Sequence, residues 1–260
     1  MNKAAAFSHL GRIKISGEIE ALTGIHIGGT DAGLAIGGAD PTVVRNGLDG
    51  RPYIPGSSLK GKMRCLLERI YKPGELKSDG NPKIHVCQSL PAYEQCFVCH
   101  VFGITPEDVR KVKGEAMPTR LLVRDAMMTD ETAEALERSL YTDMPLTQVK
   151  TEVVIDRITS AATPRQIERV PAGARFAYEL VYNVFRLEDL QWLAYIKEAM
   201  DLVEEDYLGG QGSRGYGKVR FASRRIEAKS FKPGELDIET DLSFRKWADE
   251  MKREPKRDAA

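Results

Sequence analysis

The sequence has no excess of charge of either sign, because 38 lysines and arginines balance 38 aspartates and glutamates in 260 residues. A protein-wide positive field is therefore excluded, and a nucleic-acid role would have to rest on local clusters of basic residues. Long hydrophobic runs are also missing: no stretch reaches the roughly 18 apolar residues of a membrane span, and residues 1–9 lack the apolar core of a signal peptide. We therefore expect a cytoplasmic protein.

Cysteine is scarce, and three of the four cysteines fall within one short stretch. That stretch supplies four soft metal ligands in two pairs, His85 with Cys87 and Cys96 with Cys99, and the second pair has the spacing that closes on one tetrahedral Zn²⁺ ion. His100 could replace His85, and a reduced loop without metal is the alternative. A redox role is disfavoured, since no thioredoxin-like strand and helix surround the pair. We predict a structural zinc site.

A basic stretch lies at the start of a predicted amphipathic helix. Apolar residues recur there at helical spacing, namely Leu59, Met63, Leu66, Leu67 and Ile70. Gly56 permits a tight turn, and Ser57 or Ser58 can cap the first free N–H groups. A helix N-terminus with cations nearby suits a phosphate, and the candidate cations are Lys60, Lys62 and Arg64. The alternative is an ordinary capped helix with a solvated basic face.

The periodicity of the remaining chain predicts an α+β fold. Alternating residues mark strands over 12–22, 120–126, 176–184 and 218–226, and helical spacing marks helices that end near 71 and span 190–207. Stripped of insertions, this order is the ferredoxin-like βαββαβ arrangement of RNA-recognition modules (RRM-like). We expect a single domain with a core over about 12–71, 119–126 and 174–229, a zinc-stapled insertion over 72–118, a brief helix over 133–140, a protruding β-hairpin over 147–171, and a C-terminal tail over 230–260 that is helical near 242–251.

Two segments are rich in glycine. Residues 23–50 hold eight glycines, enough for backbone to approach a ligand closely. Residues 209–218 match nucleotide-binding patterns by letters, but they follow a helix and open a strand, and Val219 stands where a phosphate-binding loop needs Ser or Thr. We instead expect a flexible loop that wraps a phosphate chain, or failing that a plain connector. Its candidate contacts are Gly212, Ser213, Arg214, Lys218 and, for stacking on a base, Tyr216.

Two of these segments together resemble the signature segments of the RAMP superfamily of CRISPR effector proteins. They read IPGSSLKG at residues 54–61 and LGGQGSRGYGK at residues 208–218. The resemblance is narrowed by TGIHIGG at 23–29, DRIT at 156–159 and PRQIER at 164–169. In matching order from about residue 13 to 226, the chain is similar to the repeated backbone subunit of type III-A (Csm) effector complexes.

The resemblance implies a subunit that multimerises along a CRISPR guide RNA and grips its sugars and phosphates whatever the base sequence. Its partners would be the guide RNA, the target RNA, further copies of itself and other type III-A subunits. The hairpin over 147–171 would be a thumb that pushes one nucleotide out of the guide–target duplex at each subunit, with Arg157, Arg165 and Arg169 as contacts. His26, in the loop after the first strand, would also face RNA.

The resemblance further implies a metal-dependent endoribonuclease that cuts the paired target RNA at regular intervals. By position its catalytic aspartate is Asp40, with Asp31 second, although an Asp before Pro in a glycine loop is by itself usually a turn residue. One carboxylate is too little for a two-metal site, so we expect the displaced nucleotide's own 2′-OH to attack while Asp40 acts through Mg²⁺ or another divalent ion, or as a base. The alternatives are a scaffold that does not cut, and a stand-alone endonuclease that processes precursor RNA with His26.

Overall fold

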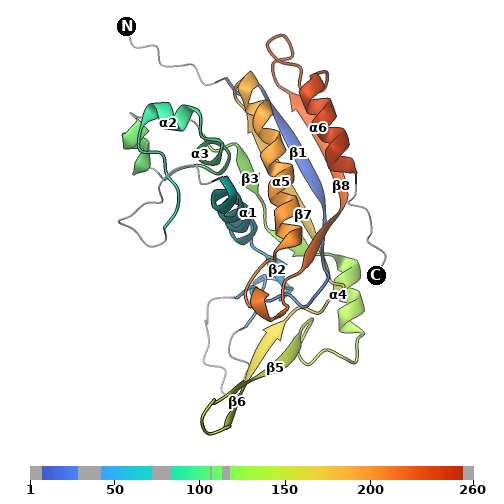
Figure 1. Ribbon diagram of the computed structural model, residues 1–260. Helices are drawn as coiled ribbons and strands as arrows, with labels where there is room; N and C mark the ends of the chain where they lie inside the picture. Colours follow the sequence, from blue (N-terminus) through green and yellow to red (C-terminus); the bar gives the residue numbers. More distant parts are fainter. Residues whose placement is uncertain (1–7, 29–41, 72–82, 106, 113–117, 254–260) are drawn as a thin grey trace.

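The computed structural model describes residues 8–28, 42–71, 83–105, 107–112 and 118–253 (Figure 1). Asp31 and Asp40, the two catalytic candidates, lie outside these residues. The described chain is a mixture of helices with two antiparallel sheets, one of six strands and one of two. None of its helices combines the length and the apolar composition that a membrane crossing needs.

The larger sheet is built around β1 (Gly11–Ala21), which pairs on one side with β7 (Arg175–Val184) and on the other with β8 (Val219–Ser230). The short strands β3 (Leu121–Val123) and β4 (Ala126–Met128) both pair with β7, and β2 (Tyr53–Ile54) pairs with β4. The resulting order is β2-β4-β7-β1-β8. The alternation predicted for the first strand is confirmed, because its isoleucines are fully buried on one face of the sheet.

Helices α1 (Gly56–Tyr71) and α5 (Leu193–Glu205) pack against each other over the sheet (Figure 1). The predicted apolar stripe of α1 is buried as far as Leu67, whereas Ile70 is 52% exposed. The predicted second helix begins instead as the 3₁₀ helix η2 (Leu187–Trp192), and the predicted strand over 120–126 is divided between β3 and β4. Asp125 lies in the gap between them, and its carboxylate accepts the N–H of Gly56 at the start of α1 at 2.7 Å.

The segment between α1 and β3 contains two short helices, α2 (Leu90–Glu94) and α3 (Phe97–Phe102), and the 3₁₀ helix η1 (Asp108–Val112). Its sequence had predicted turns alone. The difference comes from apolar residues that join the main core, since all six residues of α3 are buried and the Phe97 ring stacks on Tyr195 of α5 at 3.7 Å. This segment therefore packs on the core through side chains as well as through its cysteine cluster.

The smaller sheet is a hairpin of β5 (Gln148–Ile155) and β6 (Ala162–Arg169), which projects away from the main sheet (Figure 1). It follows α4 (Asp130–Glu137), which begins earlier than predicted because Thr129 caps it by accepting the N–H of Thr132. At the other end of the molecule lies α6 (Leu242–Lys252), which contacts β8 and α5 (Figure 1).

Candidate nucleic-acid interface and metal centre

Two of the basic residues predicted to face a phosphate on α1 are engaged inside the protein. Lys60 donates to the Leu121 carbonyl at 2.9 Å, and burial, assisted by the charge of Arg64, lowers its pKa to about 8. Lys62 pairs with Asp206 at 2.8 Å and lies 3.6 Å from the centre of the Tyr207 ring. Both cations therefore tie α1 to neighbouring elements.

Arg64, the third predicted cation on α1, links the helix to the cysteine-containing segment. Its guanidinium donates to the His85 carbonyl at 2.6 Å and to the Gly103 carbonyl at 3.0 Å, and it pairs with Glu68 at 2.6 Å. Each of its three nitrogens thus has an acceptor inside the protein. The structure thus gives Arg64 a structural task.

The start of α1 is already provided with a negative charge. The Asp125 carboxylate that accepts the Gly56 N–H occupies part of the position expected for a phosphate. Ser57 is exposed and Ser58 is half-buried beside it. A phosphate at this end would approach through Ser57 and not through the Gly56 amide.

The glycine-rich segment after α5 folds back on the loop that follows β1. The amides of Gly210 and Gly217 donate to the carbonyls of His26 and Gly24 at 2.8 and 3.0 Å, and the Lys218 amide donates to the Thr23 hydroxyl at 3.0 Å. The amides at these three positions are therefore paired inside the protein. Glycine is needed instead for close packing, since a side chain at Gly209, whose φ is +88°, would clash with the His26 carbonyl.

The middle of the same segment stays accessible. The 3₁₀ helix η3 (Gly212–Arg214) carries an exposed Ser213 and an exposed Arg214, and Lys218 is exposed at the start of the next strand. Gly212 is half-buried over the Tyr207 ring. Of the predicted contacts in this segment, the charged side chains are the ones that solvent reaches.

Tyr216 does not present its ring to solvent, so the prediction that it stacks on a base is not supported by its position. Its exposed fraction is 1%, and two cations lie over its ring, Lys150 at 4.6 Å and Arg169 at 5.1 Å from the ring centre. Cation–π attraction holds such cations in place. Tyr216 is thus a platform for basic residues of the hairpin.

The hairpin and η3 together form a basic cluster, which we define as Lys150, Arg165, Arg169 and Arg214. Glu152 lies among them, 3.0 Å from Arg165 and 3.7 Å from both Lys150 and Arg214. Burial raises the pKa of Glu152, but the hydrogen bond from Arg165 and the other nearby positive charges outweigh it and leave that pKa below its usual range. Three of the four cations thus share one carboxylate, and the fourth, Arg169, lies over the Tyr216 ring. Arg157 lies apart, exposed at the hairpin tip.

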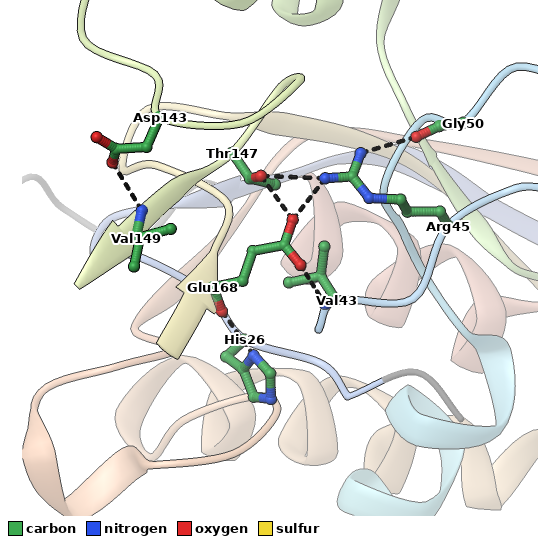
Figure 2. A network of polar contacts seen from close by, with 8 residues as sticks. All are labelled: His26, Val43, Arg45, Gly50, Asp143, Thr147, Val149 and Glu168. Atoms are coloured by element: carbon green, nitrogen blue, oxygen red, sulfur yellow. Dashed lines mark hydrogen bonds and ion pairs between the residues drawn. The ribbon is translucent and has the colours of Figure 1, made fainter. Parts of the chain in front are cut away.

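A buried network joins the base of the hairpin to the loop after β1 (Figure 2). The Glu168 carboxylate, in a residue that is 1% exposed, accepts from Arg45 at 2.5 Å, from the Thr147 hydroxyl at 2.6 Å and from the Val43 amide at 2.9 Å. Its own carbonyl accepts from His26 Nδ1 at 2.7 Å. We call these five residues the Glu168 network.

Sequence reasoning missed Glu168, Arg45 and Thr147. Glu168 lies two residues after Gln166 in a polar strand, so the two share a face, and polar residues in this pattern are typical of a solvated face. The partners of Glu168 are 21 to 142 residues distant in sequence. His26 was predicted, and the network defines the role of its Nδ1 atom. Because a carbonyl only accepts, Nδ1 carries a proton and is the donor.

The predicted metal ligands lie together. His85, Cys87, Cys96 and Cys99 are all buried, and their ligand atoms lie within 4.8 Å of one another. Three sulfurs and one imidazole nitrogen are a set that suits a tetrahedral site, and hydrogen bonds from Cys87 and Cys99 lower the pKa of Cys96, which favours the thiolate that metals bind. This cluster can hold a metal ion.

His100 is not part of the metal cluster. Its ring lies 4.5 Å from the Trp192 ring and 4.2 Å from the Tyr93 ring, measured between centres. Of the two histidines left open by the sequence, His85 is the one placed with the three cysteines.

The model of the RAMP superfamily matches residues 18–220 of this chain. The chain belongs to the RAMP superfamily. Among RAMP relatives, the "CRISPR system Cms endoribonuclease Csm3" of Methanocaldococcus jannaschii is 41% identical over 224 residues, which are 84% of this chain and 82% of the relative. The protein of the same name from Streptococcus thermophilus is 40% identical and is covered over 87% of its length by 81% of this chain.

Solved structures agree with this RAMP membership. The Methanopyrus kandleri Csm3 crystal structure aligns with a TM-score of 0.59 and 26% identity, covering 87% of this chain and 81% of that one. A chain of the Csm3–Csm4 subcomplex of the type III-A CRISPR-Cas interference complex aligns with a TM-score of 0.55 and 30% identity over 94% and 96% of the two chains. The RAMP match begins near the end of β1, includes the hairpin and the glycine-rich segment, and leaves α6 outside.

Proposed function

We propose that this chain is a backbone subunit of a type III-A CRISPR effector complex, a cytoplasmic ribonucleoprotein, and that it cleaves the target RNA which the complex captures. The observation that carries the proposal is the similarity to proteins named as Csm3 endoribonucleases, at 36–41% identity over at least four-fifths of the chain. The likeness to the Csm3–Csm4 subcomplex supports the assembly with other subunits.

The fold suits RNA binding of the RRM type. If β3 and β4 are taken as one strand and the two-residue β2 is left out, the order of the main sheet is second, third, first, fourth, and the helices α1 and α5 follow the first and third strands. We propose that this is a ferredoxin-like core, and that the cysteine-containing insertion, the hairpin and the C-terminal tail are additions to a single RAMP domain.

We propose that the basic cluster holds the sugar–phosphate backbone of the guide RNA. Three cations around the Glu152 carboxylate, with Arg169 over the neighbouring Tyr216 ring, leave a local excess of positive charge, and phosphate contacts of this kind are independent of base sequence. Further copies of the chain would bind along the same guide. The projecting hairpin, with Arg157 at its tip, would act as the thumb that displaces one nucleotide of the duplex at each copy.

For cleavage we propose that the displaced target nucleotide lies with its own 2′-OH in line with the neighbouring phosphate. Attack by that oxygen would break the bond to the next nucleotide and leave a cyclic phosphate and a 5′-OH. Asp40 is the proposed catalytic residue, acting as the base that removes the 2′-OH proton or as a ligand of Mg²⁺. The Cys/His cluster would hold Zn²⁺ as a structural ion, because its donor set is complete without a water or substrate position.

The test is cleavage by the complex reconstituted with guide RNA, complementary target RNA and Mg²⁺. We expect the wild type to cut at regular intervals, and Asp40→Ala to bind the same RNA with cutting slowed by at least about a hundredfold. Asp31→Ala, compared in parallel, should slow cutting less. Normal cutting by Asp40→Ala would remove Asp40 from the site, and absence of cutting by the wild type would favour a scaffold without catalytic activity.

A further inference from the structure

Both sides of the segment over residues 29–41 meet at the base of the hairpin. On its N-terminal side, Ile25 exchanges backbone hydrogen bonds with Val170 at 3.0 and 2.9 Å, and His26 donates to the Glu168 carbonyl. On its C-terminal side, the Val43 amide donates to the Glu168 carboxylate. Gly28 and Val43 also form an antiparallel bridge, so the two sides are joined to each other as well as to Glu168.

The hairpin contributes both of its strands to the same point. Thr147 immediately precedes β5 and donates to Glu168 of β6. At this base of the hairpin, Gln148 is paired with Arg169. Arg45 donates to Thr147 as well as to Glu168, at 3.0 and 2.5 Å, and its other nitrogen donates to the Gly50 carbonyl (Figure 2). The direction in which the hairpin leaves the domain is therefore determined by bonds to this carboxylate.

A buried carboxylate with this set of donors defines one geometry. Its two oxygens receive a guanidinium, a hydroxyl and a backbone amide that come from different segments of the chain, and rotating the hairpin about its base would leave a charge and a donor buried without partners. Replacing the carboxylate by a carboxamide keeps the shape but removes the charge and presents N–H groups to donors.

We propose that Glu168 is a positioning residue for target cleavage. It holds the hairpin in a fixed position relative to the chain on both sides of residues 29–41. This inference rests on the proposed function, in which the hairpin displaces a nucleotide and Asp40 acts on it. The nucleotide that the hairpin displaces must then be the one that is cut. A misplacement of about 1 Å between reacting groups is enough to slow a reaction markedly. Glu168 touches neither RNA nor the reacting atoms in this proposal.

The experiment compares Glu168→Gln with Glu204→Gln in the reconstituted complex. Glu204 is a matched control because its carboxylate also accepts a backbone amide and a guanidinium, from Phe221 at 2.7 Å and Arg224 at 2.9 Å, on the α5–β8 side of the domain. We expect Glu168→Gln to assemble and bind RNA normally, to cut at least about tenfold more slowly, and to spread its cuts over neighbouring phosphates. Glu204→Gln should cut at the wild-type rate and positions.

A second variant protects the test against misfolding. Thr147→Val removes one donor to the Glu168 carboxylate and leaves the pair with Arg45 in place, so the domain should fold while cutting slows and cut positions spread in the same direction as for Glu168→Gln. Hydrogen exchange should show faster exchange of the Val43 amide in both variants. This exchange readout does not depend on cleavage.

The outcomes separate this inference from the proposed function. Suppose that the wild type cuts, and that Glu168→Gln and Thr147→Val both cut at the wild-type rate and at the wild-type phosphates. The positioning role is then wrong while the proposed function stands. If Glu204→Gln shows the same spread of cut positions, the effect is one of general stability and the inference is overturned. If the wild type does not cut, the proposed function itself fails.

Discussion

The basic residues that the sequence marks as RNA contacts divide into two groups. Those on α1 have internal acceptors far away in sequence, such as Asp206 for Lys62 and the Gly103 carbonyl for Arg64, and serve the fold. Those of the basic cluster, Arg165 and Arg169 of the hairpin and Arg214 of η3, gather around Glu152 and Tyr216. Composition and spacing describe both groups equally well, because only tertiary contacts decide whether a cation is already paired.

Lys60 gives a prediction about pH. Burial and the charge of Arg64 lower its pKa from 10.5 to about 8, so between these values the unfolded chain binds more protons than the folded chain. The sign follows: stability contributed at this position rises as pH increases through that interval, by at most about 1.4 kcal/mol per pH unit. Urea unfolding of the wild type and of Lys60→Met from pH 7 to 10 measures this contribution. It is the difference between the two curves of unfolding free energy against pH.

The expected difference is that Lys60→Met is more stable relative to wild type at pH 7 than at pH 10. A charged amine in a partly buried position costs free energy at neutral pH, and a methionine of similar shape does not carry that cost. Two curves that stay parallel over the whole range would show that Lys60 titrates normally and that the Leu121 carbonyl and solvent together satisfy its charge.

At the scale of elements, the metal cluster connects the insertion to α1. Its ligand His85 also provides the carbonyl that accepts from Arg64, so a metal ion would stabilise the contact between α1 and the α2–α3 segment. The four ligands are drawn from residues 85–99, which form short helices and extended chain with little regular hydrogen bonding of their own. Segments of this kind gain much of their order from the metal.

We predict one zinc ion per chain, measured by elemental analysis of the purified protein. Cys96→Ser should lose the ion and lower the melting temperature by about 5 to 15 °C, and a strong chelator should do the same to the wild type. Cys65→Ser is the control, because Cys65 lies on α1 outside the cluster. Full zinc content in Cys96→Ser, or no zinc in the wild type, would contradict the assignment.

Much of the secondary structure could be predicted from periodicity, since β1 and α1 each bury one regular face and β7 does so over its first half. The three cysteines of the metal cluster and its two candidate histidines could also be predicted, because they are close in sequence, whereas the choice of His85 needed the structure. The division of the strand over 120–126, the helices α2 and α3, and the Glu168 network could not. Each depends on partners that are distant in sequence, as when Asp125 reaches the Gly56 amide or Glu168 reaches Val43.

At the scale of the whole molecule, the features assigned to RNA gather at one end. The hairpin, η3 and the loop after β1 lie together. Helix α6, the start of β1 and the end of β8 lie at the other end (Figure 1). The chain has a formal net charge of zero, so an excess of positive charge at one end requires an excess of negative charge elsewhere. RNA binding by this protein should therefore depend on a few phosphate contacts and not on its total charge.

The salt dependence of RNA binding tests that conclusion. Each phosphate contact with single-stranded RNA contributes about 0.7 to the slope of log K against log salt concentration. Arg165→Gln should therefore weaken binding of a guide-length RNA and reduce the slope by about this amount. The control Arg124→Gln changes the net charge equally, but Arg124 lies outside the basic cluster, paired with Glu179 of the main sheet at 2.7 Å, so both affinity and slope should stay as in the wild type. Fluorescence anisotropy over a range of KCl concentrations measures both. Equal losses of slope in the two variants would mean that total charge drives binding and that the basic cluster is not the RNA site.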